Sequence, residues 1–174
     1  MRRRISWLGF LCSGLAACSS APDHQGLETE LVAKLPDGNA QGSAVSGRYL
    51  LALTTTDCDG RCPAPDGFAI CEIGFGVSDD SVTLTQTAGR LEASGLNSQF
   101  VVDQLSGGIN TDGSFDIGGL NTISGTSLIA TVRATGTIDA NGKVSGEARG
   151  WASGSAAETS VDCVASYSLT GQRK

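Results

Sequence analysis

Four cysteines are the residues of this chain whose type and spacing carry the most chemistry. Cys58, Cys62 and Cys71 lie in the stretch DCDGRCPAPDGFAIC, and Cys163 follows much later. An even set of cysteines in an exported chain predicts two disulfides. Four thiolates could instead hold a zinc ion, but C-x3-C followed by x8 to the third cysteine is not a standard ribbon or finger. We therefore predict disulfides and no metal site.

Four cysteines allow three disulfide pairings. Cys71 and Cys163 each lie in phase with the apolar residues of a predicted strand, which favours a bridge between them. Cys58 and Cys62 would then pair within the loop. A bridge that closes so long a loop should stabilise the domain by roughly 4 kcal/mol in the chain-entropy description.

Other catalytic chemistry has little support. The one histidine, His24, lies in a small polar segment, where we interpret it as a solvent-exposed spacer residue. This argues against Ser-His-Asp and Cys-His nucleophiles and against histidine-bound catalytic metals. A hydrolase that works with carboxylates alone would need paired acids, although aspartate is also favoured in turns. The candidate pairs are Asp57 with Asp59, Asp79 with Asp80, and Asp112 with Asp116. We predict that the protein is not an enzyme and uses no cofactor.

The first residues carry the three parts of an export signal. Arg2 to Arg4 are basic, Ile5 to Leu11 are apolar, and Leu15-Ala16-Ala17-Cys18 ends the stretch. The apolar run is shorter than the roughly 20 residues that span a bilayer. The last four residues resemble the lipobox of bacterial lipoproteins. The resemblance implies a signal peptide at residues 1–17, acylation of Cys18 with groups such as palmitate, and, because Ser19 follows, sorting to the outer membrane.

The net charge of the mature chain limits the kinds of partner that it can bind. Removing residues 1–17 takes three of the 12 basic residues and none of the 18 acidic ones, which leaves a formal charge of −9. This charge argues against binding to nucleic acid. Residues 18–44 are predicted to form a lipidated, mostly flexible tether. Leu27, Leu31, Val32 and Leu35 have helical spacing, so one short helix remains an alternative there.

Residues 45–174 are predicted to form one β domain. The chain has 24 glycines and few aromatic residues, which with its Thr, Ser and Val content is typical of short strands and tight turns. DANG, at residues 139–142, is a hairpin signal. The pattern indicates eight or nine strands, so we predict an all-β antiparallel meander that closes into a small barrel, with a β-sandwich as the alternative. Candidate strands cover residues 48–56, 67–77, 81–87, 90–94, 98–109, 114–119, 126–138, 143–153 and 159–171.

Closure of the barrel would place particular residues together. The first strand of a closed meander pairs with the last, so the four cysteines are expected at one rim. Trp151 is expected on the outer face with Glu147 and Arg149. It is either a contact residue for a partner or an aromatic that shields neighbouring glycines.

The ends of the predicted barrel resemble those of the calycins, which include lipocalins and avidins. Calycins carry Gly-x-Trp on the first strand and a basic residue late on the last. Here Gly47-Arg48-Tyr49 opens the first strand, with Tyr in place of Trp, and Arg173 lies near the end of the chain. The resemblance implies a barrel fold.

Together these features predict an outer-membrane lipoprotein, anchored through Cys18, with a β-barrel domain that binds. The ligand would be a small apolar molecule in the barrel mouth or a protein partner at the disulfide rim. A structural or interaction lipoprotein with a filled barrel is the first alternative, and the carboxylate hydrolase is the second.

Overall fold

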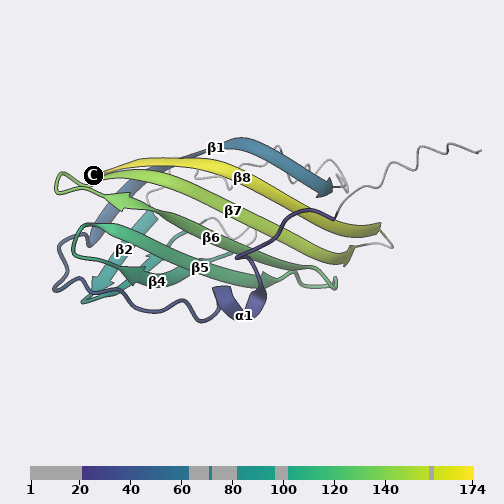
Figure 1. Ribbon diagram of the computed structural model, residues 1–174, viewed down its shortest axis with the longest axis horizontal. Coiled ribbons are helices and arrows are strands. Elements are labelled where there is room, and N and C mark those ends of the chain that lie inside the picture. The colour runs from purple at the N-terminus through teal and green to yellow at the C-terminus, as the bar shows by residue number, and fades with distance from the viewer. Residues whose placement is uncertain (1–20, 63–70, 72–81, 97–101, 157–158) are drawn as a thin grey trace, which may run out of the picture.

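The computed structural model describes residues 21–62, 71, 82–96, 102–156 and 159–174. They form one closed antiparallel barrel of eight strands that follow one another around the barrel in chain order (Figure 1). The predicted all-β meander and its closure are confirmed. The candidate strand at residues 67–77 lies, apart from Cys71, outside the described residues. The strands are β1 (Gly47–Arg61), β2 (Val82–Thr87), β3 (Arg90–Ser94), β4 (Gln104–Ile109), β5 (Ser114–Thr122), β6 (Ile129–Ile138), β7 (Lys143–Ala156) and β8 (Thr159–Arg173).

The long pairing of β1 with β8 closes the barrel. It runs from Tyr49 opposite Arg173 to Arg61 opposite Asp162, and its register shifts at a bulge between Thr55 and Asp57. A bulge adds one residue and reverses the alternation of faces beyond it. Cys58 therefore faces the interior, on the same side as Tyr49.

The interior of the barrel is the main core. Alternation along the strands puts apolar residues inside, as in β2, where Val82 and Leu84 are buried and Thr83 is exposed. Tyr49 and Leu91 have no exposed surface. Side chains from every strand meet in this core, so the predicted alternation of faces is confirmed.

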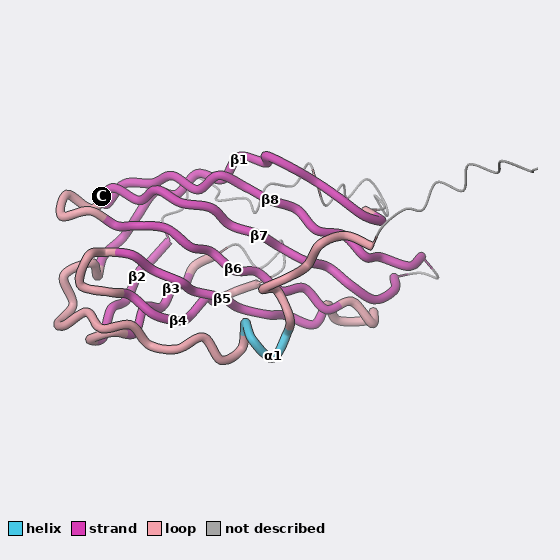
Figure 2. The backbone as a smooth tube through the Cα atoms, in the orientation of Figure 1, coloured by secondary structure: helices cyan, strands magenta, loops and turns pink. Residues whose placement is uncertain are grey.

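The N-terminal segment differs from the expected tether. Residues 21–44, including α1 (Thr29–Val32), run along the outside of the strands (Figure 2). Leu27 and Val32 are each 1% exposed. A Cβ atom on Gly118 of β5 would lie 2.7 Å from Val32 Cγ1, so the helix packs directly on the strand. The prediction of a flexible spacer is wrong for these residues, because their apolar side chains find a surface of small residues to cover. The alternative of one short helix is confirmed.

The same segment covers one end of the barrel. The Gly38 amide donates to the Gly89 carbonyl at 2.8 Å, and the Ala40 amide donates to the Ile109 carbonyl at 3.0 Å. Ala40 belongs to the main core. This end lies opposite the cysteines. Among the described residues, no helix has the length and apolar character needed to cross a membrane.

Candidate functional site

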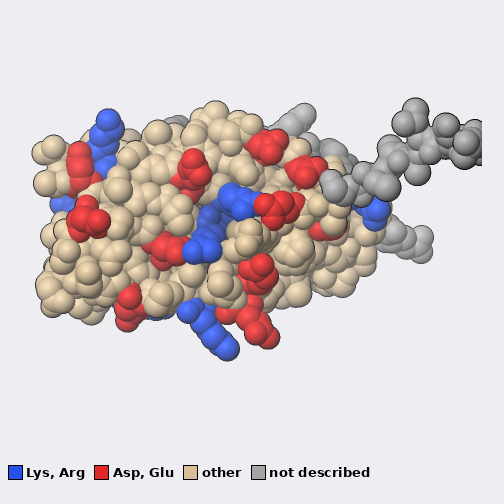
Figure 3. All heavy atoms as spheres, viewed as in Figure 1, with Lys and Arg blue, Asp and Glu red and all other residues tan. Residues whose placement is uncertain are grey.

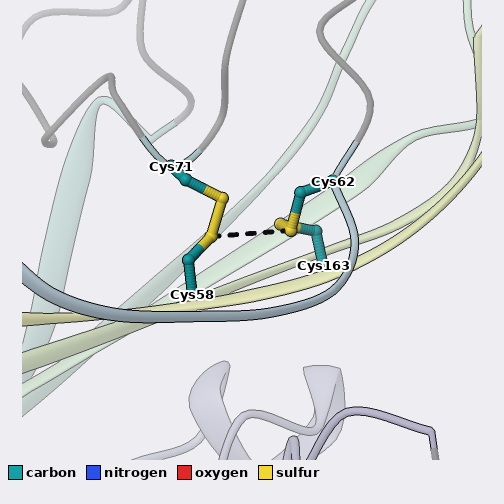
Figure 4. A group of neighbouring side chains, drawn as sticks. All are labelled: Cys58, Cys62, Cys71 and Cys163. Atoms are coloured by element: carbon teal, nitrogen blue, oxygen red, sulfur yellow. Dashed lines mark hydrogen bonds between the residues drawn. A yellow bond between two sulfur atoms is a disulfide. The ribbon is translucent and has the colours of Figure 1, made fainter. Parts of the chain in front are cut away.

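The four cysteines meet at one rim of the barrel (Figure 4). Disulfides join Cys58 to Cys71 and Cys62 to Cys163. All four sulfur atoms lie within 4.8 Å of one another. The Cys58 and Cys62 sulfurs are 3.6 Å apart, and because bridged sulfurs carry no proton, this is a packing contact between the two bridges. The predicted gathering of the cysteines is confirmed.

The favoured pairing of Cys71 with Cys163 and of Cys58 with Cys62 is wrong. β1 does not end near Cys58 but continues beside β8, where Gly60 lies directly opposite Cys163. Gly60 has a φ of 91°, a left-handed conformation that glycine adopts without strain. β1 stays paired with β8 through Arg61, and Cys62 follows directly, with its Cα atom 4.9 Å from that of Cys163.

The chemistry of the cluster depends on its oxidation state. Bridged cysteines do not titrate and offer no thiolate to a substrate or metal. Reduction of both bridges would take four electrons and would present four thiolates within 4.8 Å, the ligand set of a structural zinc site. The oxidised cluster therefore acts as a staple at the rim.

The side chains that face the barrel interior change in size from one end of the barrel to the other. One register row joins Ala130, Ala152 and Cys163 across β6, β7 and β8, opposite Gly60 of β1. The next row joins Val132, Gly150, Ala165 and Cys58. Larger side chains fill the barrel nearer the covered end. That larger set includes Tyr49, Leu84, Leu91, Ile109, Phe115, Ile117, Ile138, Val144, Leu169 and, in the row next to Ala165, Tyr167.

A second, smaller apolar cluster lies at the disulfide rim. Leu128, Val161 and Cys163 are buried in it, and the partly exposed Ile123 and Ala152 pack against it. The rows of small side chains thus lie between this rim cluster and the large side chains of the main core. Leu51 and Leu53 on β1 pack against the main core, nearer the covered end, and remain partly exposed.

Trp151 lies on the outer face of β7, as predicted, but its neighbour is the N-terminal segment. The His24 ring stacks on it, with centroids 4.3 Å apart and planes 11° apart. The indole nitrogen donates to Asp162 on β8 at 2.9 Å. The interpretation of His24 as a solvent-exposed spacer is therefore wrong, and this contact within the chain uses one face of Trp151.

Arg133 and Arg149 hold the same segment. They are register partners on β6 and β7. Arg149 donates to the Gln25 carbonyl at 3.0 Å, and Arg133 donates to the Gly26 carbonyl at 3.2 Å. Arg133 also donates to both carboxylate oxygens of Asp116, at 2.8 and 2.6 Å. These hydrogen bonds raise the pKa of Arg133, so its charge is fixed at every ordinary pH.

The arginines border a small open pocket of about 140 Å³, which the side chain of Glu147 also lines. On the face shown in Figure 3, basic side chains form a short row with acidic side chains around them. The sequence analysis did not identify these arginines as functional. Apart from Asp116, their partners are backbone carbonyls, which a sequence pattern does not reveal.

The candidate carboxylate pairs do not form a catalytic arrangement among the described residues. Asp112 accepts hydrogen bonds from the amide and hydroxyl of Ser114 at 2.9 and 2.6 Å, which lower its pKa. Asp116 is bound to Arg133. Asp57 and Asp59 are exposed on β1. Asp79 and Asp80 lie outside the described residues. The described aspartates thus have structural roles in turns and ion pairs, or face solvent.

Tyr49 and Arg173, which carry the resemblance to calycins, are in contact. The Arg173 guanidinium lies 5.5 Å from the centre of the Tyr49 ring, and its Nε donates to the Tyr49 hydroxyl at 3.0 Å. That hydroxyl donates to the Val45 carbonyl at 2.8 Å. The contact joins the first strand of the domain to the last strand, at the covered end of the barrel.

Tyr167 gives the barrel a predicted sensitivity to alkali. It is 2% exposed, and burial raises its pKa to about 12, from an ordinary value of about 10. Below about pH 10 the phenol is neutral in both states and contributes no pH dependence. Between about pH 10 and 12 the unfolded chain loses this proton more readily than the folded chain. The free energy of unfolding should therefore fall by up to about 2–3 kcal/mol.

Urea unfolding between pH 8 and 11.5 measures this fall, and Tyr167→Phe should reduce its slope. An unchanged slope in Tyr167→Phe would assign the sensitivity to another group. The starting stability of the variant does not matter for this comparison, because only the pH dependence is compared.

Comparisons with protein-family models, curated proteins and solved structures found no match to this chain. The lipobox lies in residues 1–20, outside the described residues, so acylation of Cys18 stays a prediction. The functional argument therefore depends on the sequence of the signal and on the geometry of the barrel.

Proposed function

We propose that the protein is a lipoprotein of the bacterial outer membrane, anchored through Cys18, whose barrel binds a small apolar molecule at the disulfide end. The signal sequence and its lipobox support the anchor. The change in side-chain size along the inner face supports the binding site.

The small side chains between the two apolar clusters carry this proposal. Ala130, Ala152 and Gly150 lie in two neighbouring register rows of β6 and β7, and an apolar guest would lie against these small residues. The opposite end is covered by the N-terminal segment through Gly38 and Ala40. A ligand would therefore enter from the disulfide end, past Leu128 and the bridges. Barrels that bind small molecules typically hold them in apolar pockets with one end open.

Binding, rather than catalysis, agrees with the polar groups of the domain. Among the described strand residues, the buried inward-facing positions hold no aspartate or glutamate. The oxidised cysteines supply no nucleophile. His24 is stacked on Trp151 outside the barrel.

A second candidate function is structural. Tyr49, Tyr167 and Leu91 are each no more than 2% exposed, so much of the interior is filled by the chain itself. A barrel filled throughout would serve as a rigid module that presents its disulfide rim to a protein partner.

Binding of the apolar fluorophore N-phenyl-1-naphthylamine to the oxidised, exported chain separates the two functions. We expect saturable binding and a rise in melting temperature with probe concentration. Ala152→Leu fills the region of small side chains and should weaken binding at least tenfold. Ser145→Leu, on the outer face of the same strand, is the matched control and should bind like wild type. Absence of saturable binding, or equal binding by both variants, would favour the structural function.

A further inference from the structure

Besides its packed side chains, the N-terminal segment is bound to the barrel through its backbone carbonyls. Arg149 donates to the Asp23 carbonyl at 2.5 Å and to the Gln25 carbonyl. The Thr131 hydroxyl donates to the Leu27 carbonyl at 2.9 Å in a buried site. We call Trp151, Arg149, Arg133 and Thr131 the clasp, because these outward residues of β6 and β7 hold residues 23–27 in succession.

The clasp directs the segment toward the disulfide rim. Pro22 lies so close to Gly60 of β1 that a Cβ atom on Gly60 would be 2.8 Å from Pro22 Cγ. Gly60 is the register partner of Cys163. In Figure 1 the purple segment runs across the strands toward the end of the barrel where β1 ends. The described chain therefore leaves the barrel beside the two bridges.

Little chain remains between that point and the lipid. Cys18 precedes Ala21 by three positions, and three residues reach at most about 11 Å when fully extended. A flexible tether over residues 18–44 would instead have a root-mean-square length of about 30 Å. The clasp thus replaces a long spacer with a very short one.

We propose that the disulfide rim is the surface of the barrel that faces the membrane, and that its partner is the lipid surface into which the acyl chains of Cys18 insert. This inference rests on the lipid anchor of the proposed function. The anchor holds the rim within about 11 Å of the point of insertion, and the end with Tyr49 and Arg173 points away. The apolar guest of the barrel would then be drawn from the bilayer, as a lipid or another membrane-dissolved molecule.

The charges of the rim predict which kind of lipid headgroup it can lie against. Among the described residues at the end of β1, Asp57 and Asp59 are exposed, and Arg61 lies beside them. An acidic rim is repelled by anionic lipids, and this repulsion is screened by salt. The rim should therefore lie closer to a zwitterionic surface than to an anionic one at low ionic strength.

The test uses the full lipidated protein in phosphatidylcholine vesicles that contain a headgroup-nitroxide lipid. A fluorescent unnatural residue replaces either Arg61 at the rim or Lys143 at the opposite end, so that the cysteines stay bridged. The ends of the tilted strand β7 are separated by about 30 Å along the barrel axis. We expect the label at position 61 to be quenched at least threefold more than the label at position 143.

A clasp variant tests whether the segment sets this orientation. His24→Ala combined with Arg149→Ala releases the segment, and the difference between the two labels should disappear while the protein still floats with the vesicles. Lys34→Ala removes an exposed cation from the same segment and should leave the difference intact. If the two labels were still quenched to different extents in the clasp variant, the proposed role of the clasp would be overturned.

The outcomes separate this inference from the proposed function. Equal quenching of both labels on floating wild-type protein would overturn the orientation and leave the anchor standing. Protein that fails to float would refute the anchor itself, and the orientation with it. In the absence of vesicles, the fluorescence of the rim label should not depend on protein concentration. Such a dependence would indicate that a second copy of the chain binds at the rim, and would also overturn the proposal.

Discussion

The variant Cys62→Ala/Cys163→Ala is expected to be about 4–5 kcal/mol less stable than the wild-type chain. This bridge links residues separated by 101 positions, so it removes more freedom from the unfolded chain than a short loop would. It also holds the end of β1 against β8, at the seam that closes the barrel. The loss is comparable with the whole stability of many small domains, and partial unfolding at 37 °C is the expected consequence.

The other bridge provides the matched comparison. Cys58→Ala/Cys71→Ala opens a link of 13 positions, for which the same description gives about 3 kcal/mol. Urea unfolding without reductant measures the free energy of unfolding of both variants. Peptide mapping shows which disulfide remains in each. An equal loss in the two variants would show that loop length does not govern the stabilisation. A mapped bridge between Cys71 and Cys163 in the wild-type chain would contradict the pairing.

Leu27→Ala is expected to cost about 2–4 kcal/mol of stability, as in other buried leucine-to-alanine changes. Leu27 is 1% exposed although it lies outside the barrel. Its carbonyl also accepts the buried hydrogen bond from Thr131. Loss of its side chain leaves a cavity under the segment and weakens the contacts that hold residues 23–27.

Leu31→Ala is the matched control, because Leu31 lies in the same segment, in α1, and is 43% exposed. We expect a loss below about 0.5 kcal/mol there. The melting temperatures of both variants show whether the N-terminal segment is packed on the barrel or is a flexible spacer. If Leu27→Ala proved as mild as Leu31→Ala, residues 21–35 would not be part of the folding unit, and the inferred orientation would lose its basis.

The barrel itself follows from patterns that a sequence displays directly. Alternation in SVTLTQT places Val82 and Leu84 inside, and short turns between neighbouring strands leave an antiparallel meander as the simplest path. Closure then brings β1 beside β8, and this geometry predicted that the four cysteines would gather at one rim. These inferences depend on side-chain type and spacing, which the sequence contains.

The remaining features depend on backbone events that side-chain patterns do not record. One extra residue in the bulge after Thr55 changes the face of Cys58. The continued pairing of β1 with β8 through Gly60 and Arg61 brings Cys62 to Cys163. The clasp binds carbonyl oxygens, which every residue has. Leu27 and Val32 did signal an apolar face, but a short amphipathic run is equally consistent with a marginal helix in a tether.

The two bridges cross along the chain, because Cys62 lies between Cys58 and Cys71 while its partner lies beyond both. Their spans overlap and together cover the chain from Cys58 to Cys163 without a gap. A protease that cuts once anywhere in this interval cannot separate the products, and a cut between Cys62 and Cys71 leaves them joined twice. Pairing of Cys58 with Cys62 and of Cys71 with Cys163 would have left that stretch as a point of release. The crossing therefore protects this interval against release of a fragment, since a single nick within it leaves the products covalently joined.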